Sequence, residues 1–249
     1  MGRQEGLIQV TGGVGNLSFY KSQDGYLVRT KSGVSRERMM SDPAYERTRE
    51  NIAEFGRGAL ATKLLRWAFR SLIRTAADNR VTSRLTSAII KVIKSDAISS
   101  PGQRTIAHGD VTLLEGFEFN KNAALRKTFG APFTAAIDRE TGSMLVNIPP
   151  FSPADLVSAP EGATHFRLKA AGAAIDFEAN TGSIAASESA VLPIRQERQE
   201  GLVLSHTVAT ASASPLLLVF GIEFLQGVNG VYYPLTDGMF NAMAIVRAA

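Results

Sequence analysis

Cysteine is absent from this chain of 249 residues. Its absence excludes disulfide bonds, thiolate nucleophiles and zinc sites with thiolate ligands. Histidine is scarce, because only His108, His165 and His206 are present, and they lie too far apart in the sequence to share a ligand spacing. Ser205 precedes His206, but no Gly-x-Ser-x-Gly motif indicates a nucleophilic serine. We therefore expect no metal and no cofactor, and we predict that the protein is not an enzyme.

Long apolar runs are also missing. No run reaches the roughly 18 residues that a bilayer-spanning helix needs. The first residues, MGRQEGLIQVTGG, lack the basic and then apolar order of a secretory signal peptide. We therefore expect synthesis in the cytoplasm, no membrane span and no small-molecule substrate. With 45% hydrophobic and 20% charged residues, the chain has the composition of a globular protein with a sizeable core.

Charge is divided unevenly along the chain. Residues 1–106 contain 18 lysines and arginines against 9 acidic residues, which gives a net charge of +9. Residues 107–249 contain 9 against 14, which gives −5. A positive front favours an anionic partner, or a head-to-tail contact in which the front of one copy meets the back of the next. Head-to-tail contacts propagate into rings or filaments.

Three glycines, Gly12, Gly13 and Gly15, lie close together near the N-terminus. Glycine permits positive φ angles and a close approach of two backbones. A phosphate-binding loop is the alternative interpretation of this cluster. It is not favoured, because no Gly-Lys-Ser or Gly-Lys-Thr follows and the next pattern predicts a hairpin rather than a helix.

That hairpin is predicted from two β-prone runs, 17–20 and 26–29, which flank an Asp24-Gly25 turn signal. A further short strand is predicted over 7–10, and a polar, basic tether over 31–40. An isolated hairpin is marginally stable in water, so this one must cover either its own chain or another. We predict an assembly interface made by Gly13, Gly15, Phe19, Tyr20, Tyr26 and Arg29.

A helix is predicted over 42–75. Asp42 can cap its N-terminus, and Pro43 suits its first position. The apolar residues at helical spacing, which predict its buried face, are Ile52, Phe55, Ala59, Leu60, Leu64, Trp67 and Ala68. Gly56 and Gly58 inside it predict close packing or a kink. A second helix is predicted over 76–98, and Ser-Ser-Pro-Gly stops it at 99–102.

Cations repeat at helical spacing along both predicted helices. Regularly spaced cations can neutralise the phosphates of a nucleic acid, whereas a solvated helix face is the simpler interpretation. The predicted contacts to a polyanion or an acidic partner are Lys63, Arg66, Arg70, Arg74, Arg80 and Arg84.

From about residue 105 onward, the apolar period changes to the alternation of strands. Strands are predicted over 111–120, 133–138, 143–148, 164–170, 174–179, 190–195, 202–210, 216–226, 231–235 and 240–247. Turn signals separate them at 139–142, 171–172, 180–182 and 227–230. Many short strands with regular turns predict an antiparallel β-sandwich, either immunoglobulin-like or jelly-roll-like.

Two pairs of carboxylates occur in this β-rich part. Asp138 with Glu140, and Asp176 with Glu178, stand two residues apart, so each pair can share one face of a strand. Such a pair is compatible with a glycoside hydrolase, a calcium site or a carbohydrate-binding surface. The preferred interpretation is a turn for the first pair and a solvated strand face for the second.

Four motifs can be compared with known families: Gly15-Asn16-Leu17-x-Phe19-Tyr20-Lys21, Gly25-Tyr26-x-Val28-Arg29, Asp42-Pro43-Ala44-x-x-Arg47-x-Arg49 and Asn229-Gly230-x-Tyr232-Tyr233-Pro234-Leu235. Together they resemble a family of uncharacterised Bacteroidota proteins. The resemblance covers most of the chain and implies a glycine-rich hairpin, a helix headed by Asp-Pro and a β-rich C-terminal domain. It implies a bacterial source and an accessory or structural role, and it carries no catalytic residue to this chain.

The sequence thus predicts an α+β protein in three segments. They are an N-terminal β-hairpin arm with its tether at 1–41, a basic helical segment at 42–98 and an antiparallel β-sandwich at 105–249. The predicted function is a structural subunit that assembles into a homo-oligomer such as a tube, filament or shell. In that assembly the arm is exchanged between copies and opposite charges meet head to tail. The alternatives are a basic helical module that binds nucleic acid or another polyanion, and a sandwich-fold carbohydrate binder or hydrolase.

Overall fold

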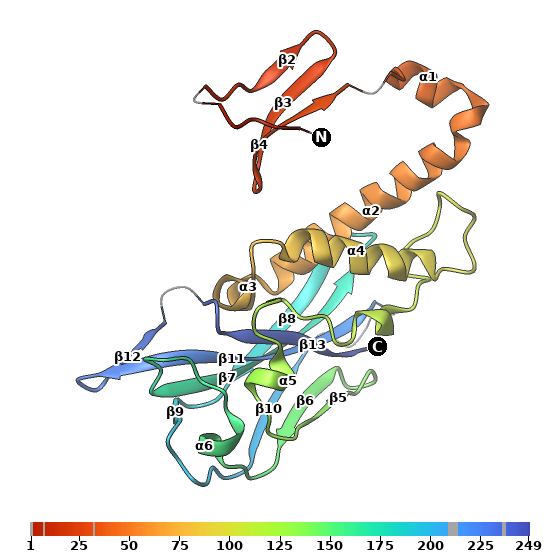
Figure 1. Ribbon diagram of the computed structural model, residues 1–249. Helices are drawn as coiled ribbons and strands as arrows, with labels where there is room; N and C mark the ends of the chain where they lie inside the picture. Colours follow the sequence, from red (N-terminus) through yellow and green to blue (C-terminus); the bar gives the residue numbers. More distant parts are fainter. Residues whose placement is uncertain (1, 7, 32, 209–213, 236–237) are drawn as a thin grey trace. The chain divides into compact units, whose positions relative to one another are not determined.

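The computed structural model describes residues 2–6, 8–31, 33–208, 214–235 and 238–249. The chain divides into two compact units, Met1–Glu50 and Asn51–Ala249. Helices and antiparallel sheets are both present, which confirms the α+β class (Figure 1). In the part of the chain that the structure describes, no helix is long and apolar enough to cross a membrane.

The first unit contains a four-stranded antiparallel sheet, which we call the N-terminal sheet. Its order is β1 (Gly2–Arg3), β4 (Gly25–Thr30), β3 (Leu17–Ser22) and β2 (Gly12–Val14). Strands β3 and β4 form the predicted hairpin, with Phe19 opposite Val28. The connecting residues are Gln23 and Asp24, one position earlier than expected. The two outer strands were not predicted.

The remaining predictions for this region are only partly correct. Residues 8–10 belong to no strand, and position 7 of the predicted strand lies outside the described residues. The expected tether contains helix α1 (Arg36–Ser41), because the Ser35 hydroxyl accepts a hydrogen bond from the Arg38 N–H and so caps a helix there. Asp42 does act as a cap, but of the short 3₁₀ turn η1 (Pro43–Tyr45).

Three helices follow this turn. They are α2 (Glu46–Ala68), α3 (Arg70–Ala76) and α4 (Val81–Lys94). The helix predicted over 42–75 is therefore interrupted at Phe69, which has φ −99° and ψ 21°, and not at a glycine. Gly58 serves close packing instead, since a Cβ there would lie 2.6 Å from Cδ1 of Ile90 on α4. The second helix is shorter than the predicted 76–98.

The long segment between the helices and the sheets has little regular structure. It contains η2 (Val111–Leu114) and the short helix α5 (Leu125–Thr128). The strand predicted over 111–120 is wrong: Asp110 caps η2 by accepting from the Thr112 N–H, and only Glu118 forms an isolated bridge, to Ala244.

The strands of the second unit form two antiparallel sheets. The small sheet has the order β10 (Leu202–Thr207), β6 (Ser143–Ile148), β5 (Thr134–Ile137). In the large sheet, the central strands are β7 (His165–Asp176) and β11 (Leu216–Val228). Strands β8 (Thr181–Glu188) and β9 (Leu192–Pro193) pair with β7, and β12 (Val231–Pro234) and β13 (Ala242–Ala248) pair with β11. The short helix α6 (Pro153–Leu156) follows β6 in the chain.

The prediction was wrong in the middle of the large sheet. Gly172 does not end a strand, because β7 runs through it. A Cβ at Gly172 would lie 2.2 Å from Sδ of Met144 on the small sheet, so glycine is required there by packing. Strand β8 was missed altogether, since its sequence TGSIAASE contains one large apolar residue, Ile184, and offers almost no alternation signal.

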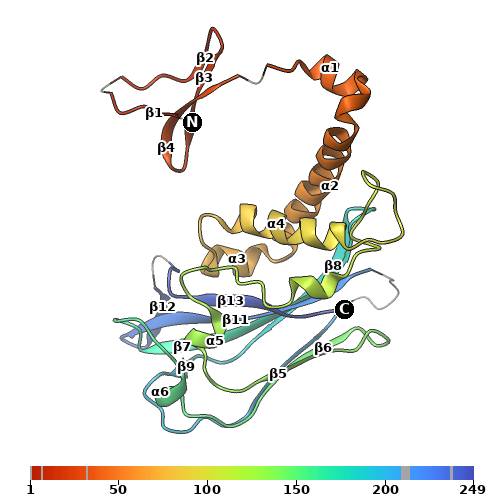
Figure 2. The same ribbon diagram turned by 45° about the vertical axis from the view of Figure 1, so that its right-hand side comes forward.

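The large sheet separates two hydrophobic cores (Figures 1 and 2). On one face, Phe166, Phe220 and Phe224 pack toward the small sheet. On the other face, Leu217 and Val219 pack toward the helices, with Leu65 of α2 in the same core. Because residues 51–98 share this second core with the strands, they belong to the same compact unit, which differs from the three segments predicted from the sequence.

The small sheet approaches both edges of the large one. Strand β10 lies beside β8, and β5 lies beside β13, so the strands curl around the first core. At the first of these seams, Ser187 of β8 and Nδ1 of His206 on β10 are 3.2 Å apart. This layered arrangement places α3, α4 and the C-terminal part of α2 on the outer face of the large sheet (Figure 2).

Candidate interaction surfaces

The N-terminal sheet has no core of its own. None of the described residues between 2 and 50 is buried in the chain. By strand alternation, Phe19, Tyr26 and Val28 share one face, and Tyr20 and Leu27 share the other. These side chains are only partly buried, so the sheet keeps some apolar surface in contact with water on both sides.

The predicted interface residues of this sheet are brought together by β2, β3 and β4. The Lys21 ammonium lies 5.4 Å from the centroid of Tyr26, and the Arg29 guanidinium 5.6 Å from that of Tyr20. Each cation therefore covers an aromatic ring, one on each face. The remaining two residues of the prediction are in or next to β2: Gly13 lies on the strand, and Gly15 forms the following turn with φ +55°.

A second apolar surface lies on α2, where the predicted buried face of the helix is wrong. Ile52, Phe55, Ala59 and Leu60 were expected on the buried face, but they are exposed, and we call them the outward stripe. Phe55 and Leu60 expose 60% and 59% of their surface. Of the predicted face only Ala68 is buried, with Leu64 partly so.

The actual buried face of α2 is built from smaller residues. Gly58, Ala61, Leu65 and Ala68 face the core, and so does Thr62, whose hydroxyl is 3.1 Å from that of Thr86 on α4. Small residues allow the helices to approach closely, and the predicted face was wrong because it left out Gly58, Ala61 and Leu65. Helix α2 therefore has apolar residues on both faces, and only one is covered.

The third surface is basic. Residues 51–106, all of which the structure describes, contain ten lysines and arginines and only three acidic residues. Lys63, Arg66, Arg70 and Arg74 are exposed, as predicted, and we call them the basic surface. None of the four has an ion-pair partner among the described residues. The break at Phe69 divides them between α2 and α3.

The two remaining predicted cations differ from these four. Arg84 is partly buried: its guanidinium pairs with the Asp78 carboxylate at 2.5 Å and donates to the carbonyls of Glu118 and Phe119. It is therefore an internal tie between α4 and the following loop, and its assignment to a partner contact is wrong. Arg80 is exposed, and its backbone N–H donates to Asp78.

All three acidic residues of this region are used inside the fold. Glu54 accepts from the Gly102 N–H, and Asp78 pairs with Arg84. Asp96 is fully buried and accepts from the N–H groups of Ile98, Ser99 and Thr105.

The pKa of two of these carboxyls follows from their surroundings. Burial alone raises the pKa of Asp96, but the hydrogen bonds from Ser99, Thr105 and Ile98 outweigh it and hold the pKa well below its usual range. Burial also raises the pKa of Asp78, and donors on Lys121, Arg80 and Arg84 lower it below the usual value. Both groups stay ionised at neutral pH while presenting no charge to a partner.

The paired carboxylates of the β-rich part serve turns. Asp138 accepts from the Glu140 N–H at 2.9 Å and from the Thr141 hydroxyl at 2.7 Å. The Thr141 hydroxyl and the backbone N–H groups of Glu140 and Thr141 lower the pKa of Asp138. Asp176 likewise accepts from the N–H groups of Glu178 and Ala179. In each pair the first carboxylate is held by backbone donors, as in ordinary Asx turns.

The histidines lie in three different places. His108 is near Ser99 and Asp96, His165 near Thr164 and Tyr232, and His206 near Ser187. Burial lowers the pKa of His206. Among the described residues, no three His, Asp or Glu side chains are grouped so that they can hold a metal ion.

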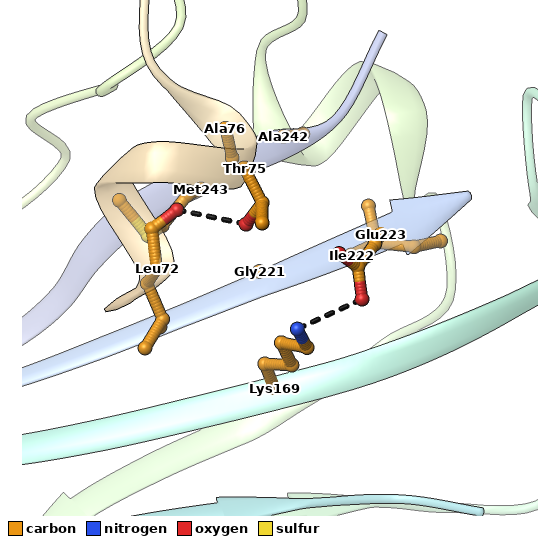
Figure 3. Close-up of a pocket in the computed structure, with 9 residues that line it drawn as sticks. All are labelled: Leu72, Thr75, Ala76, Lys169, Gly221, Ile222, Glu223, Ala242 and Met243. Carbon is orange, nitrogen blue, oxygen red and sulfur yellow. Dashed lines mark hydrogen bonds and ion pairs between the residues drawn. The ribbon is translucent and has the colours of Figure 1, made fainter. Parts of the chain in front are cut away.

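A small hollow beneath α3 contains an ion pair (Figure 3). Lys169 of β7 and Glu223 of β11 meet there, with Nζ 2.8 Å from the carboxylate. Thr75 and Leu72 of α3 line the hollow. Its volume of about 10 Å³ accommodates one water molecule at most, so the pair neutralises itself at a sheet–helix contact and leaves no room for a substrate.

A larger hollow of about 240 Å³ lies between α2, α4 and the turn after β7. Its cation, Arg57, donates to the carbonyls of Gly102 and Arg104 and so holds the loop after α4. The remaining lining is mostly apolar, with Leu60, Ile93 and Phe177 among it.

Comparison with known proteins gives no relative for this chain. No protein-family model matches it, and neither a curated protein nor a solved structure is significantly similar. The three surfaces described above are therefore interpreted from their own chemistry.

Proposed function

We propose that the chain is a non-enzymatic structural subunit that self-assembles into a tube, filament or shell. The observation that supports this most directly is the N-terminal sheet, in which no described side chain is buried although both faces carry aromatic residues. Burial of apolar surface is the main stabilising contribution in a small fold. A sheet of so few residues therefore needs a covering surface, and a second copy would supply it.

The strands of this sheet have the features of an exchanged arm. Strand β2 is an edge strand with glycine at two of its three positions, so another backbone could approach it without a steric clash. In the proposed assembly, the edge of the sheet adds to a neighbour's strand and the side chains of Phe19 and Val28 pack against that neighbour.

The outward stripe of α2 supports the same proposal. Ile52, Phe55 and Leu60 expose half or more of their surface on one side of a helix whose other side is in the core. Apolar residues gathered on one exposed face are typical of protein–protein contacts. We assign the stripe to a contact with a neighbouring copy.

The uneven distribution of charge along the chain favours a head-to-tail contact in the proposed assembly. The exposed cations of residues 51–106 would meet the net negative residues 107–249 of the next copy. We interpret the two curled sheets as a sandwich of the immunoglobulin-like or jelly-roll-like kind, which offers edges and loops for such a contact. A head-to-tail contact of this type generates rings or open filaments.

The proposal is tested by removing apolar side chains from the N-terminal sheet. The double variant Phe19→Ser/Val28→Ser deletes one cross-strand pair, and its oligomeric state is compared with that of the unaltered chain by analytical ultracentrifugation over a wide range of concentrations. We expect the unaltered chain to form large species whose proportion rises with concentration. We expect the variant to remain mostly monomeric.

Val203→Ser is the matched control. Val203 lies on β10 of the small sheet and is 60% exposed, so the substitution also removes exposed apolar surface without touching the N-terminal sheet. It should assemble like the unaltered chain. A monomeric unaltered chain at high concentration and low salt would show that the protein is not a self-assembling subunit.

A further inference from the structure

We propose that the basic surface and Trp67 together bind single-stranded nucleic acid. This inference goes beyond the proposed function, because it combines the cations that would guide a neighbouring copy with the one tryptophan, at the C-terminal end of α2, and assigns them a different ligand. The outward stripe, in contrast, lies nearer the N-terminal end of α2 and is apolar.

The first observation is the absence of competing negative charge. Within residues 51–106, Glu54, Asp78 and Asp96 are all turned to internal partners, as described above. Lys63, Arg66, Arg70 and Arg74 are exposed and have no ion-pair partner among the described residues. The other two acids of α2, Glu46 and Glu50, lie at its N-terminal end, before the basic surface. A phosphate backbone approaching the basic surface therefore meets cations and no exposed carboxylate of residues 51–106, which is the arrangement that polyanion binding requires.

The second observation is the position of Trp67. Its side chain is 50% exposed, although tryptophan is among the side chains with most to gain from burial. On helix α2, Lys63 is one turn before Trp67 and so shares its face, while Arg66 and Arg70 lie within three residues of it in the sequence. An exposed aromatic ring with cations nearby along the chain offers a stacking surface to a base and neutralising groups to the adjacent phosphates.

This combination favours a single strand over other anionic partners. In a duplex the faces of the bases are stacked on one another and are not accessible to a side chain. An acidic protein surface would satisfy the cations but would supply no planar base for Trp67. A single strand satisfies both at once.

The experiment uses the full chain, in which Trp67 is the sole tryptophan. Tryptophan fluorescence therefore reports this one position while oligo(dT) of about 20 nucleotides is added, a length that exceeds typical site sizes. We expect quenching of the emission on binding. If four phosphates are neutralised, the affinity should fall by about 50-fold between about 50 and 200 mM NaCl.

Variants distinguish this surface from the overall charge, with a labelled oligonucleotide and fluorescence anisotropy as the measurement. Lys63→Gln/Arg66→Gln should weaken binding and reduce the slope of log K against log salt by about 1.4, because two phosphate contacts are lost. The matched control is Arg195→Gln/Arg198→Gln, which removes the same charge from exposed positions between β9 and β10, outside the helical segment. It should bind almost like the unaltered chain.

Trp67→Ala tests the stacking. It should weaken oligo(dT) binding by roughly 5- to 150-fold, which corresponds to the loss of one stacked base. The same variant should bind heparin, a polyanion without bases, as the unaltered chain does. All five substituted positions of these variants are exposed, and thermal unfolding followed by circular dichroism checks that each variant is folded.

Four outcomes would overturn the proposal. They are no binding of oligo(dT) at about 50 mM NaCl, equal weakening by the control variant, equal affinity for a duplex of the same length, and no effect of Trp67→Ala on oligo(dT) binding. Trp67 emission that changes with protein concentration alone, and not on addition of oligo(dT), would instead assign this surface to a contact between copies.

Discussion

Glycine has opposite consequences at two positions of this chain. Gly172 lies on β7, where a Cβ would come within 2.2 Å of Sδ of Met144 and 2.6 Å of Nε2 of His206. Gly56 lies on α2, where a Cβ would meet no atom within 4 Å. The residue type is the same, but at the first position it is needed for packing between the two sheets, and at the second it only lowers helix propensity.

We expect Gly172→Ala to lower the free energy of unfolding by about 1–3 kcal/mol, because the added methyl group overpacks a filled core. The measurement is urea unfolding followed by circular dichroism.

Gly56→Ala is the matched control. It adds the same methyl group in open space within a helix and should raise the free energy of unfolding by roughly 0.5–1 kcal/mol. If Gly172→Ala were neutral, the sheets could separate locally at no cost, and the close approach described above would not be a constraint.

Asp96 gives the fold a dependence on acid pH. Its folded pKa lies below that of the unfolded chain, about 3.9, so the unfolded state binds more protons as the pH falls. The stabilisation it provides is complete above about pH 4 and is lost progressively as the pH drops below that value. We expect Asp96→Asn to destabilise the protein most at neutral pH, with a difference from the unaltered chain that shrinks below pH 4.

Urea unfolding at several pH values between about 3 and 7 checks this, since other carboxylates affect both proteins alike. A difference that stays constant with pH would mean that Asp96 acts through its shape and not through its charge.

At the scale of the element, α2 is the part of the protein whose sequence is most easily misread. Most of its large apolar residues are exposed, whereas its buried face consists mainly of small residues together with Leu65. The reason is that α2 packs against α4 through Gly58 and Thr62, positions where a large side chain would hold the helices apart. The outward stripe therefore lies on the surface, and the face with Gly58, Thr62 and Leu65 lies in the core.

This assignment predicts different results for the two faces. Ile52→Ser/Phe55→Ser changes exposed residues, so the free energy of unfolding should change by no more than about 0.5 kcal/mol per site while self-association weakens. Leu65→Ala removes a fully buried side chain and should lower the free energy of unfolding by about 2–5 kcal/mol. Urea unfolding and sedimentation measure the two effects separately, and a large loss of stability in the first variant would place its residues in a core.

At the scale of the whole molecule, the large sheet joins the helices and the small sheet into one unit. Its two central strands, β7 and β11, are apolar on both faces, so each contributes to both cores. Residues 51–106 are positive on the outside because their three acids are used inside the fold. The excess of positive charge in the first part of the sequence thus appears in the fold as a positively charged face of the helices.

That face predicts how salt affects self-association. If opposite charges guide the contact between copies, raising NaCl from about 50 to about 500 mM should shift the assembly toward smaller species, because the Debye length falls to a few ångströms. Light scattering coupled to size exclusion measures the shift. Association that is unchanged or strengthened by salt would indicate an apolar contact without the head-to-tail charge component.

Much of the local structure follows from the sequence alone. Four features are encoded by neighbouring residues. Turn chemistry predicts the β3–β4 hairpin, and an aspartate before a proline predicts the cap at Asp42. Helical spacing predicts the exposed cations, and strict alternation predicts strand β6. The Asn229-Gly230 turn between β11 and β12 belongs to the same group, since both residues adopt positive φ as that turn requires. Such features depend on contacts within a few residues, and so a pattern can reveal them.

Tertiary structure decided the features that depend on distant partners. Only the packing of α4 shows that Gly58 and Leu65, and not Ile52 and Phe55, face the core, and only the neighbouring sheet explains why β7 continues through Gly172. The sequence likewise did not determine the partners of Arg84 and of the three acids, because the pattern of charged residues does not show whether a side chain contacts solvent or an internal partner. Composition established that cysteine chemistry is impossible and that the front of the chain is positive. The fold determined which of those charges remain available to another molecule.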